Sequence, residues 1–177
     1  MKIVKWLVLL ILLFLPQHVK ARCGFESAGD ALQIILPATA FGFTLIKGDW
    51  QGSTQAAVTF GVTVFTVTEL KYLCNCTRPN GGCHSFPSGH TAISFASAGF
   101  MQRRYGWRYG LPYYGAAVVV GCSRVHAKAH WVRDVFGGAA IGWLSSRIFS
   151  SPYCRGKLHI CPEVTLHSAS LSATYCF

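Results

Sequence analysis

The sequence predicts an all-α fold, a compact helical membrane bundle of five or six short helices, with the residues suited to chemistry at the outward ends of the helices. Of the 177 residues, 51% are hydrophobic and only 12% are charged, whereas about a quarter of the residues of soluble domains are charged. The mean hydropathy is +0.36. The apolar residues are grouped in segments between short polar stretches. Together these observations exclude an ordinary soluble domain, and the length allows one domain.

The start of the chain is typical of a secretory signal peptide. Lys2 and Lys5 precede the apolar stretch 6–15, and Val19-Lys20-Ala21 resembles a small-residue cleavage site. A first membrane helix is the alternative, although the stretch is shorter than the roughly 17 to 25 residues that cross a bilayer. We therefore divide the chain into a signal peptide or first membrane helix (1–21), a helical domain (22–149) and a Cys-containing tail of unassigned role (150–177).

Five apolar segments in the helical domain are each expected to form a helix. Most are shorter than the roughly 20 residues of an ideal span, which favours tilted or partly embedded helices over straight spanning ones. Small residues in them permit close helix packing in lipid. The segments are 31–46, 54–70, 90–101, 109–122 and 135–149, and the small residues are Gly99, Gly137, Gly138, Ala139 and Gly142. In the tail, alternation through Leu171, Ala173, Tyr175 and Phe177 predicts a strand.

The basic residues indicate which ends of the helices face inward. The net charge is +10, but the basic residues occur singly or in pairs without the clustered face that nucleic-acid binding needs. One group lies in alternate loops, as expected for the inward side: Lys2, Lys5, Lys47, Arg103, Arg104, Arg108, Arg147, Arg155 and Lys157. The other group breaks the rule on the outward side, which indicates an anionic ligand there: Lys71, Arg78, Arg124, Lys128 and Arg133.

The outward loops hold a set of residues suited to binding phosphate. Ser88 is the expected N-cap of a helix whose free N–H groups and dipole attract an anion, and Gly89 lets a phosphate approach the backbone. Lys71, Arg78 and Arg124 would supply a donor cage for the charge that develops on a phosphoryl group.

Two histidines and one carboxylate are the candidate catalytic groups. His130 and Asp134 are four residues apart, which predicts one face of a helix, where the carboxylate binds one ring nitrogen and leaves the other as a nucleophile. His90 would protonate the leaving oxygen and later deprotonate the attacking water. There are only six acidic residues, and apart from Glu26 and Asp30 they are far apart in sequence, so neither a metal nor a cofactor is expected.

Each piece alone has a structural explanation, such as a turn, a cap or an interfacial anchor, but their joint order is specific. The sequence resembles the type 2 phosphatidic acid phosphatase superfamily, which also includes bacterial class A acid phosphatases and vanadium haloperoxidases. Three motifs carry the resemblance: Lys71-Tyr-Leu-Cys-Asn-Cys-Thr-Arg78-Pro79, Pro87-Ser88-Gly89-His90 and Ser123-Arg124-Val-His-Ala-Lys-Ala-His130-Trp-Val-Arg-Asp134.

The resemblance implies a role for each motif residue and a class of substrate. His130 is the implied nucleophile, Asp134 its orienting partner and His90 the general acid, with Lys71, Arg78, Ser88, Gly89 and Arg124 holding the phosphate. It implies a metal-independent membrane phosphatase in the lipid phosphate phosphatase branch, at the bacterial inner membrane and facing the periplasm. Membrane lipids are expected partners, and the oligomeric state is not predicted.

The motifs specify a phosphate substrate but do not identify the lipid that carries the phosphate. A general likeness around residues 86–109 to small bacterial lipid A 1-phosphatases favours lipid A. Undecaprenyl diphosphate or phosphatidylglycerophosphate phosphatases, a soluble-type acid phosphatase and a vanadate enzyme are the alternatives within the superfamily. An inactive membrane-interaction module is the alternative outside enzymes, although such a module has no need of His90, His130 and Asp134 together. The short segments, the cysteines and the tail depart from the lipid-phosphatase pattern.

The eight cysteines favour disulfides in an oxidising compartment. A bridge from Cys83 to Cys74 or Cys76 is predicted to stiffen the loop that carries Arg78. The alternative is a zinc site made of these three cysteines and His84.

Overall fold

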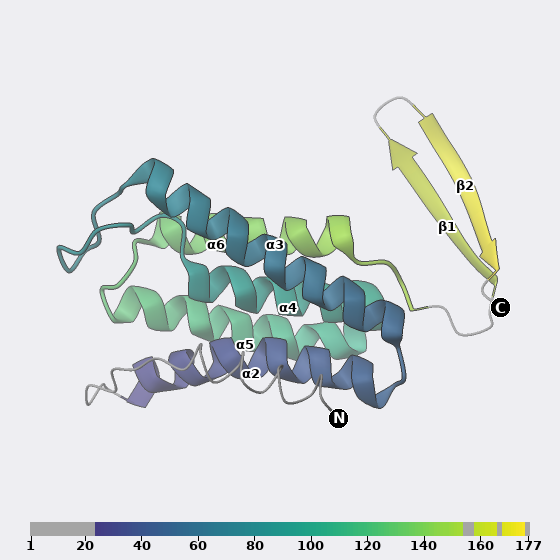
Figure 1. The fold of residues 1–177 in the computed structure, drawn as a ribbon, viewed down its shortest axis with the longest axis horizontal. Coiled ribbons are helices and arrows are strands. Elements are labelled where there is room, and N and C mark those ends of the chain that lie inside the picture. The colour runs from purple at the N-terminus through teal and green to yellow at the C-terminus, as the bar shows by residue number, and fades with distance from the viewer. Residues whose placement is uncertain (1–23, 154–157, 166–167, 176–177) are drawn as a thin grey trace.

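The computed structural model describes residues 24–153, 158–165 and 168–175 (Figure 1). Five helices follow in chain order: α2 Gly24–Ile46, α3 Trp50–Cys74, α4 Gly89–Tyr105, α5 Trp107–His126 and α6 Val132–Phe149. Each contains one of the five predicted apolar segments, so the predicted all-α bundle is confirmed. The predicted signal peptide or first membrane helix (1–21) lies outside the described residues.

The helices are longer than the apolar segments because polar residues form their first and last turns. Asp49 is the N-cap of α3 and accepts a hydrogen bond from the Gly52 N–H at 2.8 Å. Asn75 ends α3 in the left-handed conformation, and Gly106, with φ of +92°, makes the turn between α4 and α5. At 23 and 25 residues, α2 and α3 are long and apolar enough to cross a membrane.

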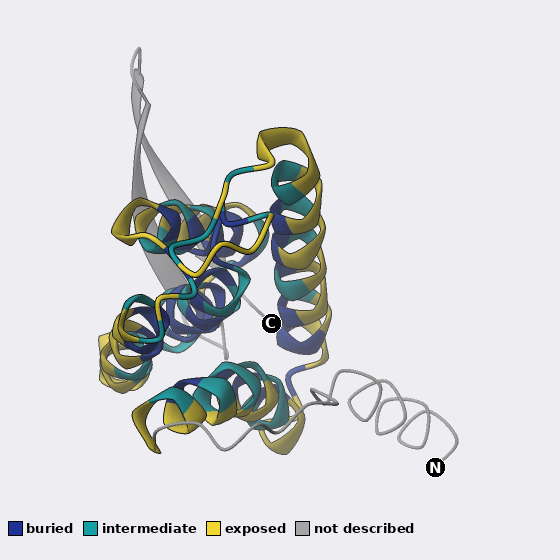
Figure 2. Cartoon of the chain, turned by 90° about the vertical axis from the view of Figure 1, so that its left-hand side faces the viewer, coloured by how far each residue is buried: buried dark blue, intermediate teal, exposed yellow. Residues whose placement is uncertain are grey.

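Helix α4 lies at the centre and contacts each of the other four described helices. Figure 2 shows its buried residues facing the inside of the bundle. They are mostly small, including Ala92, Ala96 and Gly99, and the larger Phe100 and Met101 fill the core towards the end of the helix. This composition brings the neighbouring helices close to the α4 backbone.

The closest approach is between α4 and α6, at two of the glycines predicted to allow it. A Cβ on Gly138 would collide with the Ser88 carbonyl oxygen, and a Cβ on Gly142 with the Ala92 carbonyl oxygen and, at 2.7 Å, the Ala96 nitrogen. These contacts fix the start of α4 against the first turns of α6, where the candidate catalytic residues lie.

A buried ion pair closes the opposite end of the bundle. Arg104 donates to both carboxylate oxygens of Asp49, at 2.6 and 2.7 Å, and the Tyr105 hydroxyl donates to the same carboxylate at 2.7 Å. Burial alone would raise the pKa of Asp49, but the bonds from Arg104, the Gly52 N–H and Tyr105 outweigh it and hold the pKa below its usual value. Arg104, predicted as an inward loop charge, is instead 4% exposed and acts as a structural cation.

Large apolar side chains cover much of the outside of the bundle. Such a surface suits lipid contact rather than water. Among the most exposed are Ile46, Trp50, Phe65, Leu73, Leu111, Phe136 and Ile148.

The tail forms an antiparallel hairpin of β1 Leu158–Thr165 and β2 Ser168–Tyr175, with Leu158 opposite Tyr175 and Thr165 opposite Ser168. The strand predicted through Leu171, Ala173 and Tyr175 is confirmed, while Phe177 lies outside the described residues.

We expect Gly142→Ala to lower the free energy of unfolding by about 1–3 kcal/mol, because the new Cβ collides with the backbone of α4. Thermal unfolding in detergent measures the effect. Gly115→Ala is the matched control, since a Cβ on that exposed α5 glycine meets open space, and it should leave stability unchanged or raise it by up to about 1 kcal/mol. Equal melting temperatures for the two variants would contradict the packing argument.

Candidate active site

The predicted site residues gather at one end of the bundle, where α3 ends, α4 begins, and α5 connects to α6 (Figure 1). The inward basic residues that the structure describes lie near the opposite ends of the same helices. The structure therefore brings together three segments, 71–79, 87–90 and 123–134, of which the last two are separated by more than 30 residues along the chain.

Asp134 is the buried centre of this end. It lies in the first turn of α6 and its side chain is 0% exposed. One carboxylate oxygen, Oδ2, accepts bonds from the Trp131 N–H at 2.9 Å and from the Ser85 hydroxyl. Its backbone carbonyl accepts from the Ser88 N–H at 2.9 Å. Asp134 thus joins α6 to the loop before α4 and to the N-cap of α4.

His130 faces Asp134 from the connection between α5 and α6. The distance from His130 Nδ1 to Asp134 Oδ2 is 3.7 Å, and the His130 side chain is 3% exposed. Among the described residues neither His130 Nδ1 nor Asp134 Oδ1 has a hydrogen-bond partner. The prediction that the two residues share one helix face is wrong, because α6 begins only at Val132 and His130 precedes it. They nevertheless face each other because the chain turns into the helix between them.

The surroundings of His130 keep its imidazole neutral. Burial is the main cause that lowers its pKa, and the positive charges of Lys71 and Arg78 lower it further. The Ser85 backbone and the Asp134 carboxylate act in the opposite direction, and the resulting pKa is about 4. A neutral ring keeps a nitrogen lone pair available as a nucleophile.

The start of α4 has the expected form of an anion site. Ser88 is the N-cap, as predicted, but its hydroxyl pairs with the Thr91 hydroxyl at 3.0 Å instead of capping the helix. Its N–H already binds Asp134, so the unpaired donors of this helix start are those of the first turn, beginning at Gly89. A Cβ on Gly89 would touch only Val67, at 3.5 Å.

Arg124 is held in the site by hydrogen bonds to two residues of α2. Its guanidinium is 3% exposed and donates to Asp30 Oδ1 at 2.6 Å and to the Glu26 carbonyl at 2.9 Å. The same Asp30 oxygen lies 3.4 Å from Nε2 of His90.

Lys71 and Arg78 approach the site from α3 and from the loop after it. Lys71 is partly buried in the last turn of α3. Arg78 is held by its own loop, because its Nε donates to the Cys83 carbonyl at 3.2 Å and its backbone N–H to the Gly82 carbonyl at 2.7 Å. The site therefore has three cations around one neutral histidine.

Sequence reasoning missed two residues of this end. Ser85 has no signal in the sequence beyond its place shortly before the Pro87-Ser88-Gly89-His90 motif. Asp30 does have a signal in the sequence, because it is an acidic residue directly before the first apolar segment of the helical domain.

The predicted bridge from Cys83 to Cys74 or Cys76 is wrong. Cys74, Cys76 and Cys83 are free thiols, so the bridge that was to stiffen the Arg78 loop is not formed. In the part of the chain that the structure describes, no three His, Cys, Asp or Glu residues are placed to hold a metal, so the alternative zinc site is not formed either. The loop is fastened by hydrogen bonds instead, including one from the Ser85 N–H to the Cys76 carbonyl at 2.8 Å.

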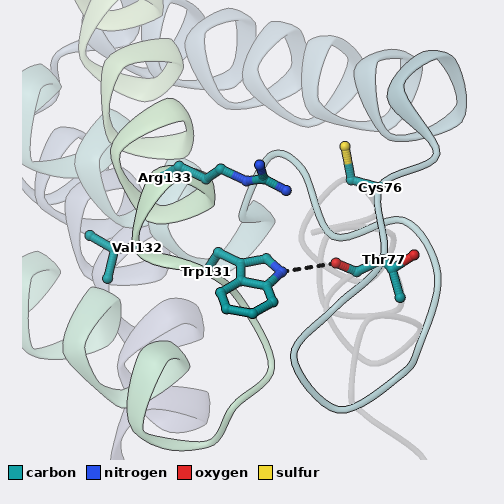
Figure 3. A pocket seen from close by; sticks show the side chains of 5 residues that line it. All are labelled: Cys76, Thr77, Trp131, Val132 and Arg133. Atoms are coloured by element: carbon teal, nitrogen blue, oxygen red, sulfur yellow. Dashed lines mark hydrogen bonds between the residues drawn. The ribbon is translucent and has the colours of Figure 1, made fainter.

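An open hollow lies beside the buried site. Cys76 and Thr77 line it on one side, and Trp131, Val132 and Arg133 on the other (Figure 3). The Trp131 indole N–H donates to the Thr77 carbonyl at 2.9 Å and ties the two sides together. Trp131, Val132 and Arg133 are the three residues between His130 and Asp134 in the sequence. The hollow that they line is open to the outside.

Comparison with known proteins identifies the family. A family model described as the PAP2 superfamily matches residues 80–152. A lipid A 4'-phosphatase of Helicobacter pylori is 31% identical over 152 residues, which cover 79% of this chain and 76% of that protein. The chain belongs to the PAP2 superfamily. The resemblance carried by the three motifs is therefore confirmed.

Other PAP2 relatives agree. A lipid A 1-phosphatase of Porphyromonas gingivalis is 39% identical over 94 residues, 46% of this chain and 21% of that protein. The crystal structure of Aquifex aeolicus LpxE superposes with a TM-score of 0.62 at 22% identity, over 72% of this chain and 87% of that one, and has the same fold. The family and the lipid A phosphatase relatives together support a membrane lipid phosphatase, which is a phosphoric ester hydrolase.

We expect the ring of His130 to titrate near pH 4. NMR of histidine-labelled protein in detergent measures this titration. Because an unfolded chain takes up this proton at about pH 6.5, the unfolding free energy should fall as pH drops from 6.5 towards 4. Lys71→Gln removes one of the charges that disfavour the imidazolium, so the midpoint should move to higher pH. A His130 midpoint at 6.5 or above would contradict this account.

Proposed function

We propose that the protein hydrolyses the phosphate monoester or diphosphate of a membrane lipid through a phosphohistidine on His130, without a metal, and that lipid A is its substrate. The observation that carries the proposal is a buried histidine that faces the Asp134 carboxylate and whose pKa is lowered by burial and by the charges of Lys71 and Arg78. That combination suits a nitrogen nucleophile acting on a dianionic phosphate.

In the first step, Nε2 of His130 attacks phosphorus, since Nδ1 is turned towards Asp134. The N–P bond forms as the bond from phosphorus to the lipid oxygen breaks, and His90 donates a proton to the departing oxygen. Asp134 then stabilises the positive charge that develops on the imidazole ring.

In the second step, water attacks the phosphohistidine. His90, now neutral, takes a proton from the water, the N–P bond breaks, and inorganic phosphate leaves. His130 returns to its neutral form, and His90 holds the proton taken from the water, which it can give to the next departing oxygen.

The remaining residues hold the phosphoryl oxygens during both steps. Lys71, Arg78 and Arg124 supply positive charge, and the first turn of α4 at Ser88 and Gly89 supplies backbone N–H groups and the positive end of the helix dipole. A low-dielectric setting strengthens these interactions, because the site lies at the end of a closely packed bundle.

Similarity to a lipid A 4'-phosphatase over most of the chain and to a lipid A 1-phosphatase over the motif region supports lipid A as the substrate. The apolar exterior and the two long helices α2 and α3 suit a substrate whose tails stay in the bilayer. We place the enzyme in the bacterial inner membrane, with the site facing the periplasm and the N-terminal segment acting as signal or anchor, because the cations of the site then have a reason to lie outward.

The test is phosphate release by detergent-purified protein from lipid A, undecaprenyl diphosphate, phosphatidylglycerophosphate and phosphatidic acid, with chelator present. We expect release from lipid A to resist the chelator and to fall at least about 10³-fold in His130→Ala. His126→Ala is the matched control, because His126 is an exposed histidine at the end of α5, and it should keep wild-type release.

Two results would overturn the proposal. Absence of release from every lipid by folded wild-type protein would remove the lipid substrate. Activity retained in His130→Ala would remove the phosphohistidine. Release from another lipid of the panel in preference to lipid A would replace the substrate and leave the mechanism standing.

The hollow beside the site supports a contact with the lipid head group. Arg133 is 67% exposed there, and we expect Arg133→Gln to raise KM for lipid A about two- to fivefold, as for one exposed ion pair. Release from a small aryl phosphate, which lacks the head group, should change less. Arg108→Gln removes an exposed arginine at the opposite end of the bundle and serves as the control. The same KM change for both substrates would argue against a head-group contact.

A further inference from the structure

Asp30 reaches the site from an element that carries none of the three motifs. It lies in the second turn of α2, outside residues 80–152 that match the family model. Its side chain is 24% exposed, and one oxygen, Oδ1, faces two groups of the site at once. These are the Arg124 guanidinium, at 2.6 Å from Nη1, and the His90 ring, at 3.4 Å from Nε2.

The packing of α2 is suited to this contact. Gly29, next to Asp30, is buried against α5, and a Cβ there would collide with the Ser123 side chain and come within 2.7 Å of Arg124 Nη2. The Glu26 carbonyl, one turn earlier, accepts a second bond from the same guanidinium at 2.9 Å. Helix α2 therefore approaches the site closely at the point where Asp30 meets Arg124.

The Asp30 carboxylate lies beside the cations proposed to bind phosphate, where its negative charge would repel the substrate. Its presence there therefore needs a physical explanation. Here it neutralises Arg124, a buried cation that would otherwise lose hydration without a counterion. The Asp30 carboxylate also lies 3.4 Å from the ring of His90, which must donate a proton to the leaving oxygen. A negative charge at this distance favours the protonated form of the ring.

We propose that Asp30 is a positioning residue of the phosphatase reaction, which holds the phosphate-binding Arg124 and the proton-donating His90 at fixed places through one carboxylate oxygen. This inference rests on the proposed function of the site. Asp30 acts on the reaction through these two side chains.

A purely structural clasp between α2 and α5 is the alternative, and the pH dependence separates the two. The charged and titratable groups that face His90 come from four parts of the chain: Arg124 of α5, Asp30 of α2, His130 of the α5–α6 connection and Lys71 of α3. Burial is the main cause that lowers the pKa of His90, Arg124, His130 and Lys71 lower it further, to about 3, and Asp30 is the negative group that opposes them. Its removal should make the protonated ring of His90 less stable and shift the pH profile of kcat with it, whereas a residue that acts only as a clasp would change the melting temperature and leave the pH profile in place.

The test compares Asp30→Asn, which keeps the shape and removes the charge, with the wild type in phosphate release as a function of pH. We expect kcat to fall about tenfold or more, within the range that general acid catalysis supplies, and the alkaline limb of the profile to move to lower pH. Asp30→Glu, which restores the charge, should return the alkaline limb towards the wild-type position. Glu69→Gln is the control, because it makes the same change at an exposed carboxylate near the end of α3 and should leave both quantities unchanged.

A second measurement does not depend on turnover. NMR titration of histidine-labelled protein should place the His90 midpoint at lower pH in Asp30→Asn than in wild type. Thermal unfolding of each variant separates a local effect from a loss of fold.

Wild-type kcat, pH profile and His90 titration in folded Asp30→Asn would overturn the positioning role, as would a loss of activity that only follows a lower melting temperature. An inactive wild-type protein would instead refute the proposed function. The His90 titration would then still decide whether Asp30 controls the proton on this ring.

Discussion

The arrangement of the site depends on the buried carboxylate of Asp134. A carboxylate that is 0% exposed must be supplied with donors, and these come from Ser85 and from the backbone of Trp131. Its own carbonyl then fixes the N–H of Ser88 at the start of α4. One residue thereby sets the positions of the loop after α3, the N-cap of α4 and the connection that carries His130. The geometry of the candidate site and the local fold consequently have the same cause.

The two ends of the bundle use buried charge for different purposes. At one end, Asp49 and Arg104 satisfy each other and the nearby donors, and this pair only holds helices together. At the other end, Asp30 pairs with Arg124 while a further cation, Lys71, and the neutral His130 stand close by. That end has an excess of positive charge, which an anionic substrate is suited to balance. The closely packed α4, rich in small residues, connects the two ends rigidly.

Much of this was predictable from local sequence. The five apolar segments predicted the five helices, and the motif order predicted that His90, His130, Asp134 and Arg124 meet at one end. The errors concern residues whose environment is set by distant parts of the chain. Arg104 was interpreted as a surface charge because its partner Asp49 is 55 positions away. His130 was placed on a helix because spacing alone does not reveal that α6 begins after it.

The sequence by itself determined the residue types of the chemistry and the membrane character of the helices, because a phosphate cage needs particular side chains and a helix in lipid needs apolar ones. Only the tertiary structure decided which polar groups satisfy one another. Asp30 binds Arg124 across 94 positions of chain, and Ser85 binds Asp134 across 49. Such contacts depend on how closely helices approach, which here follows from glycines such as Gly29 and Gly138 at the interfaces. Hydrogen bonds act over about 3 Å, so their partners are fixed by packing and not by spacing along the chain.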